Sequence, residues 1–381
     1  MDNALEAPIA EAPSKKRFLA AVLVVIILGG LGFYLSRPLF ASYYLKKGIA
    51  EFQSSEAGNL ERADSYFQKS LRWNSNDPLT HYYLARVAFG QGTPMVGYTA
   101  WTEADWPRVI EHYEKALALG LEKKDALRAE IALSDTGRAY RKLENYEKAD
   151  EIFREHISRY PDKSFVDRYL LALDDFEVNN NPEEGLAVLP AAIEAKDKID
   201  LRMFRVYTLL ARYKHFFGDF DAAERYAKMA IESVPVGEEK HLDIQIAHII
   251  LGYQLARDKN IKAALAEFDK VKAAATELPN PSNAFRCSLA GIYLQNNDYK
   301  NAIETAEKKL NNRLDKSTVG YADSICLQVL GDSFLAQGKK KEAKKYLEQY
   351  LDITGAFKDK NIYVMRNRAE FQKILNDLVI R

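Results

Sequence analysis

The chain has 381 residues, of which 47% are hydrophobic and 28% are charged, a composition typical of folded rather than disordered proteins. Lysine and arginine together number 54, as do aspartate and glutamate, so the charge balance gives no reason to expect nucleic-acid binding. Two cysteines exclude a disulfide-dense scaffold and a zinc site built from paired cysteines. A chain of this length must be modular or elongated.

The N-terminal part differs in composition from the rest. Residues 1–17 form a short tail that ends in Lys15, Lys16 and Arg17, and residues 18–35 are uncharged and mostly apolar. A helix over that run rises about 27 Å, roughly the thickness of a bilayer's hydrocarbon layer. We therefore expect one uncleaved transmembrane helix over residues 18–35, with the tail in the cytoplasm and the rest of the chain in the periplasm of a bacterial inner membrane.

The alternative for this segment is a cleaved signal peptide. Such a peptide has a shorter apolar region, of about 7–15 residues, and ends in a small-x-small cleavage site. Leu39 stands where a small residue would be needed. About five residues, Pro38 among them, separate Leu35 from the next helical pattern, so we expect the folded domain to lie close against the membrane.

One pattern recurs from residue 36 to residue 355. In one unit, the small residue Gly137 lies twelve positions before the small residue Ala149. The large residue Tyr140 lies nine positions before Ala149. Self-similarity at a period near 40 residues predicts stacked pairs of antiparallel helices, which cross where side chains are small. The second small residues or their equivalents, one in each of eight units, are Ala63, Val109, Ala149, Gly185, Ala223, Ala264, Ala302 and Ala343.

The pattern resembles the tetratricopeptide repeat (TPR), a helix–turn–helix unit. In one unit the residues at the family's positions are Leu133, Gly137, Tyr140, Ala149, Phe153 and Pro161. The resemblance implies an all-α, TPR-type helical solenoid of about eight repeats over residues 36–355. Pro190 departs from the pattern because it falls in a second helix, where we expect a kink or a shortened helix. Residues 356–381 carry apolar residues at helical spacing and are expected to form a capping helix on the last repeat.

Residues that could carry chemistry are scattered. The sequence has none of the usual phosphate-binding, zinc-protease, serine-hydrolase or haem-attachment motifs, so we expect no catalytic residue, no metal, no cofactor and no enzyme activity. Cys287 and Cys326 lie in the first helices of neighbouring units. A disulfide between them would require export to an oxidising compartment, and two buried, unpaired thiols are the favoured interpretation.

A long insertion separates the two helices of the second unit. It contains Met95, Tyr98, Trp101 and Trp106, and clustered aromatic residues of this kind are typical of protein interfaces. Either these four residues bind a partner, or the insertion folds back and its aromatic side chains fill the groove of the solenoid.

In the repeats that this chain resembles, the first helices line a concave groove that holds peptides. The residues that follow the small position, and so face this groove, are Arg86, Arg138, Asp174, Arg212, Tyr253, Gly291 and Asp332. Arg141 should lie near the three arginines. Guanidiniums on one wall would repel each other, so we expect a ligand that is acidic at one end. The other end of this ligand should be hydrophobic, because the groove becomes more apolar further along the chain. The alternative is an ordinary solvated, charged surface.

The leading interpretation is a membrane-anchored scaffold or adaptor that binds other proteins of a cell-envelope complex, in export, pilus, motility or assembly machinery. The alternative is a translocon-associated periplasmic chaperone or adaptor that binds segments of exported clients. A stable, stoichiometric partner would favour the scaffold, and many weakly bound clients would favour the chaperone. Both interpretations need protein partners and a membrane contact through residues 18–35, and neither needs a nucleic acid.

Overall fold

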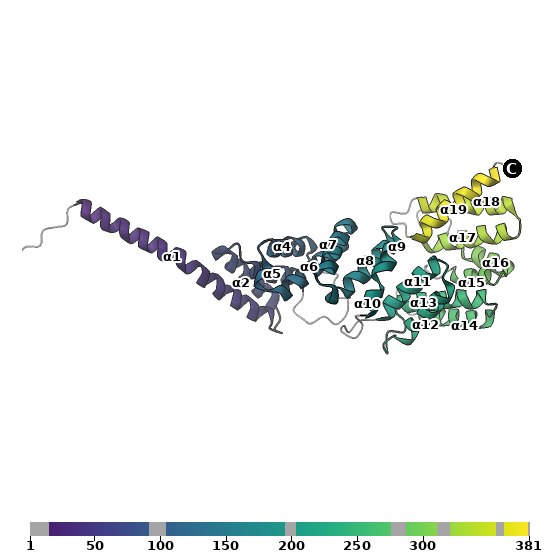
Figure 1. The fold of residues 1–381 in the computed structure, drawn as a ribbon, viewed down its shortest axis with the longest axis horizontal. Helices are drawn as coiled ribbons and strands as arrows, with labels where there is room; N and C mark the ends of the chain where they lie inside the picture. Colours follow the sequence, from purple (N-terminus) through teal and green to yellow (C-terminus); the bar gives the residue numbers. More distant parts are fainter. Residues whose placement is uncertain are drawn as a thin grey trace, which may run out of the picture. The chain divides into compact units, whose positions relative to one another are not determined.

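The computed structural model describes residues 15–90, 104–194, 203–275, 287–310, 321–355 and 362–379. Within its helices, the side chains of residues 15–18, 20–22, 25, 272–275, 321–322 and 379 are not described. The described residues form helices and no strand (Figure 1). They fall into two compact units, Met1–Ile152 and Phe153–Arg381.

Unit 1 consists of helix pairs. Its helices are α1 (Lys15–Phe52), α2 (Asn59–Trp73), α3 (Pro78–Ala88), α4 (Trp106–Ala118), α5 (Leu121–Lys124), α6 (Ala126–Lys142) and the first half of α7 (Tyr146–Arg159). α2 packs on the C-terminal part of α1, where Phe67 meets Leu45, Ile49 and Phe52 in one hydrophobic cluster. The same cluster continues into α3, α4 and α6, so neighbouring pairs share one core.

Unit 2 repeats this arrangement. After the second half of α7 and the short 3-10 helix η2 (Pro161–Lys163), its helices are α8 (Phe165–Glu177), α9 (Pro182–Val188), α10 (Pro190–Glu194), α11 (Met203–Phe216), α12 (Phe220–Glu232), α13 (Leu242–Arg257), α14 (Ile261–Ala275), α15 (Ser288–Gln295), α16 (Tyr299–Leu310), α17 (Tyr321–Ala336), α18 (Lys340–Gly355) and α19 (Ile362–Val379). The first helix of each pair packs on the second, and also on the first helix of the next pair where α11 meets α13 and α15 meets α17.

The small residues explain how closely the helices approach. Over the described residues there are eight helix pairs, and the eight marker residues named from the sequence all lie in second helices and are all buried. At Gly185 of α9, an added Cβ would collide with the hydroxyl of Tyr213 and would lie 2.9 Å from Cβ of Asp175. The prediction of an all-helical solenoid of paired helices is therefore confirmed.

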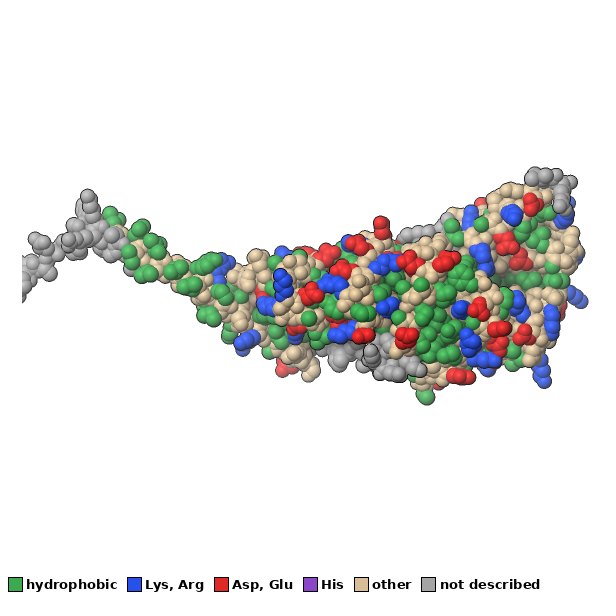
Figure 2. Space-filling view, viewed as in Figure 1, with side chains coloured by type: hydrophobic (Ala, Val, Ile, Leu, Met, Phe, Trp, Pro, Cys, Tyr) green, Lys and Arg blue, Asp and Glu red, His purple; other side chains and the backbone are tan. Residues whose placement is uncertain are grey.

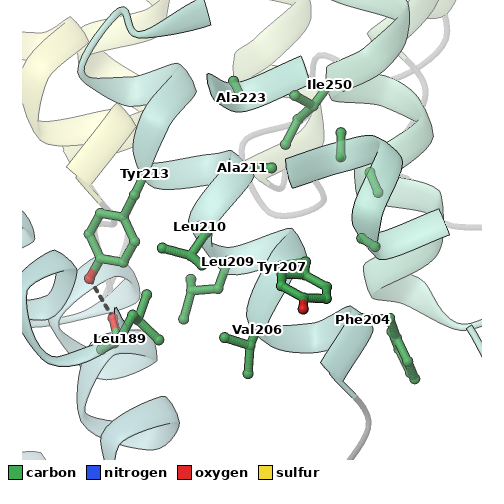
Figure 3. Packing of buried hydrophobic residues seen from close by; sticks show 14 of the residues in the cluster. Leu189, Phe204, Val206, Tyr207, Leu209, Leu210, Ala211, Tyr213, Ala223 and Ile250 are labelled. Carbon is green, nitrogen blue, oxygen red and sulfur yellow. Dashed lines mark hydrogen bonds between the residues drawn. The ribbon is translucent and has the colours of Figure 1, made fainter. Parts of the chain in front are cut away.

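The prediction of a shortened helix at Pro190 is also confirmed. α9 ends at Val188 and α10 begins at Pro190, with Leu189 buried between them. The neighbouring helix α11 fills this part of the core, and Leu209, Leu210 and Tyr213 lie in the same cluster as Leu189 (Figure 3). The hydroxyl of Tyr213 donates to the carbonyl oxygen of Ala172 at 2.6 Å, which fixes α11 against α8.

α1 corrects one sequence prediction. We expected about five residues to separate the apolar run from the next helical pattern, but α1 runs through Pro38 as a single helix. Proline removes one intrahelical hydrogen bond, and packing on α2 compensates, because Trp73 contacts ring residues on both sides of the proline. Its ring centroid lies 5.6 Å from that of Phe33 and 4.6 Å from that of Phe40.

The predicted transmembrane segment lies inside α1. Its described apolar side chains are exposed, among them Leu19, Ile26 and Leu35, and Figure 2 shows apolar side chains along this helix. Part of the segment, the side chains of residues 18, 20–22 and 25, lies outside the described residues, as do residues 1–14 of the predicted tail. Over the described residues, no helix combines the length and the apolarity that a membrane crossing requires. The transmembrane helix over residues 18–35 is thus not shown and stays a prediction.

The two cysteines correct a second prediction. Cys287, just before α15, and Cys326 of α17 form a disulfide, with their Cα atoms 5.1 Å apart. Both side chains are buried, as expected, but they are paired and not free. The reason is that the first helices of neighbouring repeats pack side by side, which brings equivalent positions within bonding reach.

Candidate functional site

The two groove arginines of unit 1 lie on either side of one carboxylate. Arg86 comes from α3, and Arg138 and Asp135 come from α6. Asp135 accepts from Nη1 of Arg86 at 3.3 Å and from Nη1 of Arg138 at 3.0 Å. The hydroxyl of Tyr113, from α4, donates to the same carboxylate at 3.2 Å. Two predicted site residues are thus brought together by a residue that sequence reasoning missed.

This cluster is largely withdrawn from water. The side chain of Asp135 is 6% exposed, that of Arg138 14% and that of Arg86 22%. Burial disfavours the charge of Arg86, but the neighbouring Tyr113 and Asp135 outweigh that cost and raise the pKa of Arg86. The protein therefore supplies its own counter-charge to both arginines. The acidic ligand stays a prediction, but repulsion between these guanidiniums is no longer a reason for it.

Arg141 lies one helical turn beyond Arg138, near the C-terminal end of α6. It is partly exposed, and Lys142 beside it is exposed. Positions three apart share one face of a helix, so Arg141 lies on the same face of α6 as Arg138. The face made by Arg86, Arg138 and Arg141 is called the arginine face of unit 1 below.

The remaining predicted groove residues belong to unit 2. Arg212 of α11 pairs with Glu177 of α8, and its guanidinium lies 4.2 Å from the ring centroid of Phe176. Tyr253 of α13 lies over Gly291, where an added Cβ would be 2.9 Å from the ring. His215 of α11 lies near Tyr253, with ring centroids 6.0 Å apart. Arg212 and Tyr253 thus lie on successive first helices, as the pattern predicted.

The first half of α19 lies on this same face of unit 2. Tyr363 packs its ring against Phe176 and Phe216, with centroids 5.5 and 5.4 Å apart. Its hydroxyl donates to the carbonyl oxygen of Arg212 at 3.0 Å and lies 3.2 Å from Nδ1 of His215. Because the hydroxyl hydrogen goes to Arg212, the His215 nitrogen must be the donor to the Tyr363 oxygen.

Charge also shapes this contact. Burial, and then the positive charges of Arg366 and Arg257, lower the pKa of His215 to about 4, so this imidazole is neutral near pH 7. Farther along α19, Glu370 approaches Asp332 of α17, the last of the predicted groove positions. Burial, and then the charge of Glu370, raise the pKa of Asp332 to about 7. Where α19 packs on α17, the ionised form of Asp332 is therefore disfavoured while Glu370 is charged.

Sequence reasoning assigned no role to Tyr363 or Arg366, although a pattern was present. The two residues are three apart, so they share a helix face. That face differs from the apolar one formed by Phe371 and Leu375, which are buried in the core with α17 and α18. A helix that only covers the last repeat needs the apolar face alone.

Of the four candidate binding residues of the insertion, the structure describes only Trp106. Met95, Tyr98 and Trp101 lie outside the described residues. Trp106 is the first residue of α4, and Asp105 before it caps the helix by accepting from the backbone N–H of Arg108. The Trp106 ring packs on Phe89 with centroids 5.4 Å apart. Trp106 therefore packs within unit 1, and a role of these four residues in partner binding stays a prediction.

Histidine placement gives no sign of metal chemistry. His81 and His112 bring their Nδ1 atoms to 3.1 Å inside unit 1. Burial, and then the neighbouring His81, lower the pKa of His112 to about 4, so this pair is neutral near pH 7. In the part of the chain that the structure describes, no three His, Cys, Asp or Glu side chains are grouped to hold a metal.

Comparison with known proteins identifies the repeats. Residues 132–163 and residues 326–357 each match a family model described as a tetratricopeptide repeat. The first match covers most of α6, together with α7 and η2, and the second covers most of α17, together with α18. The resemblance proposed from the sequence is thus confirmed at two of the helix pairs. No curated protein matches the chain.

Several solved structures are similar in fold. A tetratricopeptide repeat protein from Parabacteroides merdae is 15% identical, with a TM-score of 0.44 over 78% of this chain and 99% of that one. The pilF protein of Pseudomonas aeruginosa is also 15% identical, with a TM-score of 0.44 over 70% of this chain and 98% of that one. Yeast Tom70 is 14% identical, with a TM-score of 0.36 over 98% of this chain and 76% of that one.

Proposed function

We propose that this protein is a scaffold that binds other proteins through the first helices of its tetratricopeptide repeats. It acts by binding, without an enzyme activity of its own. The observation that carries the proposal is the arginine face of unit 1, where Asp135 holds Arg86 and Arg138 in fixed positions beside Arg141. Arginines are enriched in the energetically dominant parts of interfaces, and a face that is already ordered loses less entropy when a partner binds.

In this proposal the scaffold serves a cell-envelope complex and is anchored in the inner membrane by residues 18–35. The apolar run with basic residues before it supports the anchor, and so do the exposed apolar side chains of α1. The disulfide between Cys287 and Cys326 supports a periplasmic location for the repeats, because such bonds persist in oxidising compartments. A reporter that is active only in the cytoplasm, fused after Arg381, should give no activity. A strong signal would contradict this orientation.

The binding surface needs a test that leaves the fold intact. Arg138→Glu would place a second carboxylate beside buried Asp135, so it would damage unit 1 itself. Arg141→Glu changes the neighbouring, partly exposed residue of the same face. Lys115→Glu on α4 is the matched control, because it makes the same charge change at an exposed position of a second helix.

The full chain, extracted in mild detergent, should capture a stoichiometric partner that mass spectrometry identifies. Arg141→Glu should weaken that complex at least about tenfold, a loss of about 1.4 kcal/mol, and Lys115→Glu should leave it unchanged. Equal binding by both variants would contradict the arginine face as the site. Loss of capture only when a Gly/Ser turn replaces residues 91–104 would place the site in the insertion. Many weakly bound, unrelated clients would favour the chaperone instead.

A further inference from the structure

α19 is held in two different ways along its length. Its second half packs on the last repeat: the ring of Phe371 lies 5.0 Å from that of Tyr350, and Leu375 is buried beside it. Arg368 donates to the carbonyl oxygen of Leu351 at 2.6 Å. These contacts close the apolar end of the repeats, which is the ordinary task of a terminal helix.

The first half of α19 reaches α8 and α11, which belong to earlier repeats. There Tyr363 lies between Phe176 and Phe216 and bonds to the backbone of Arg212. Covering the last repeat does not require this contact. The first half therefore occupies a surface that has its own binding chemistry.

Arg366 supplies the second part of that chemistry. Its Nη1 donates to the carbonyl oxygen of Phe216 at 2.8 Å, and its guanidinium lies 4.7 Å from the centroid of the Phe216 ring. Phe216 is the last residue of α11, and the last carbonyl groups of a helix have no partner within that helix. A cation is favoured there by the helix dipole as well. The surface thus accepts an aromatic hydroxyl and, three positions later, a guanidinium.

The polar contacts of this half are of a kind that can be exchanged, whereas Ile362 and Val364 beside them are buried and must be exposed when the helix lifts. Tyr363 is only partly buried and Arg366 is exposed. A single hydrogen bond, even one to a charged group, adds little net stability, and exposure lowers its contribution further. Farther along, the charge of Glu370 on α19 disfavours the ionised form of Asp332 on α17.

We infer that the surface formed by α8 and the C-terminal end of α11 is a helix-docking site that α19 occupies in the free chain. Its exchange partner is an amphipathic helix of another protein with a tyrosine followed three residues later by an arginine. The inference rests on the proposed scaffold function and specifies the chemistry of one partner. It also gives α19 a regulatory role, because the surface becomes available only when the first half of the helix lifts.

Competition with α19 sets the affinity that a partner can show. A segment tethered by a short connection acts at an effective concentration in the millimolar range. A free helix with the same intrinsic affinity therefore binds poorly to the intact protein. Its apparent dissociation constant falls in proportion as the open fraction rises. Substitutions that loosen Tyr363 and Arg366 should thus strengthen binding of a separate helix.

The probe is a fluorescent peptide with the sequence of residues 362–379, added to the full-length protein in mild detergent. It should bind the variant Tyr363→Ala/Arg366→Ala at least about tenfold more tightly than the wild type. The control variant Met365→Ala/Lys373→Ala changes two exposed residues of the same helix and should behave like the wild type. A peptide that carries both alanines at Tyr363 and Arg366 should not bind the opened variant.

Equal binding of the peptide to the variant and the wild type, or no binding to either, would overturn the inference. Hydrogen exchange on the wild type gives a second measurement that does not depend on any variant folding. Excess peptide should speed exchange at residues 362–368 and leave residues 371–375 protected, and no change at residues 362–368 would also overturn the inference. Partner capture through the arginine face of unit 1 is measured separately, so the scaffold proposal can hold when this inference fails.

Discussion

Replacing Asp135 by asparagine tests whether unit 1 neutralises its own arginines. The substitution keeps the size of the side chain and removes its charge, so Arg86 and Arg138 lose the carboxylate that lies 3.3 and 3.0 Å from them. Removing one partner of a buried ion pair costs about 3–5 kcal/mol. The two guanidiniums are 22% and 14% exposed and keep some hydration, so we expect a loss near the lower limit, about 3 kcal/mol.

The free energy of unfolding, measured by urea denaturation with circular dichroism, gives this loss directly. Asp64→Asn is the matched control, because Asp64 pairs with Arg108 in the same unit while both side chains are about 30% exposed. Such a half-exposed pair contributes about 0–1 kcal/mol. A double-mutant cycle of Asp135→Asn with Arg138→Gln should give a coupling energy of at least about 1 kcal/mol.

The outcome decides what the arginines are for. If Asp135→Asn destabilises the protein no more than Asp64→Asn does, the two guanidiniums do not depend on Asp135. The ion pairs with Asp135 would then not be what neutralises Arg86 and Arg138, and a carboxylate from a partner would again be the better counter-charge. If the loss is about 3 kcal/mol, Arg86 and Arg138 are fixed parts of the fold and recognition falls to Arg141.

Three further predictions concern unit 2. Cys326→Ser should lower the free energy of unfolding by about 4 kcal/mol on a chain-entropy estimate for a loop of this length, and a reducing agent should have the same effect on the wild type in urea denaturation. Gly185→Ala should lower the free energy of unfolding by about 1–3 kcal/mol in the same assay, because the new Cβ displaces the Tyr213 hydroxyl that bonds to Ala172. Gly32→Ala is the control: its Cβ would meet nothing within 4 Å, so it should not lower the free energy of unfolding. Asp332→Asn should flatten the pH dependence of stability between about pH 4 and 7. Folding raises the pKa of Asp332 from 3.8 to about 7, so its contribution is fully present below about pH 4 and is lost as the pH rises through 7. A wild-type profile that matches that of Asp332→Asn would contradict this assignment.

The repeat architecture could be read from the sequence because local sterics dictate it. Two helices of a pair approach closely only where a side chain is small, so residues such as Ala149 and Ala223 mark every crossing. Pro190 is equally local, since it cannot continue a helix without losing a hydrogen bond. The same local reasoning failed at Pro38, where the packing of Trp73 on another helix restores continuity.

The charge pairing of the candidate site could not be read in this way. Assigning groove positions one repeat at a time identified Arg86 and Arg138, but it ignored Asp135, which lies one turn before Arg138 and 49 positions after Arg86 in the chain. Pairing across repeats depends on how neighbouring helices are set side by side. The disulfide shows that such information was partly present, because Cys287 and Cys326 are 39 residues apart, about one repeat.

α19 shows most clearly what periodicity leaves out. The spacing of Phe371 and Leu375 predicts an apolar face, and that face packs on the last repeat. It does not reveal that Tyr363 and Arg366 form a second, polar face that satisfies the end of α11. Contacts more than about 7–10 Å apart with no shared partners contribute almost independently to stability. In the inference above, the first half of α19 lifts from α11 while the second half still seals the last repeat, so that one helix would serve both as a cap and as a removable ligand.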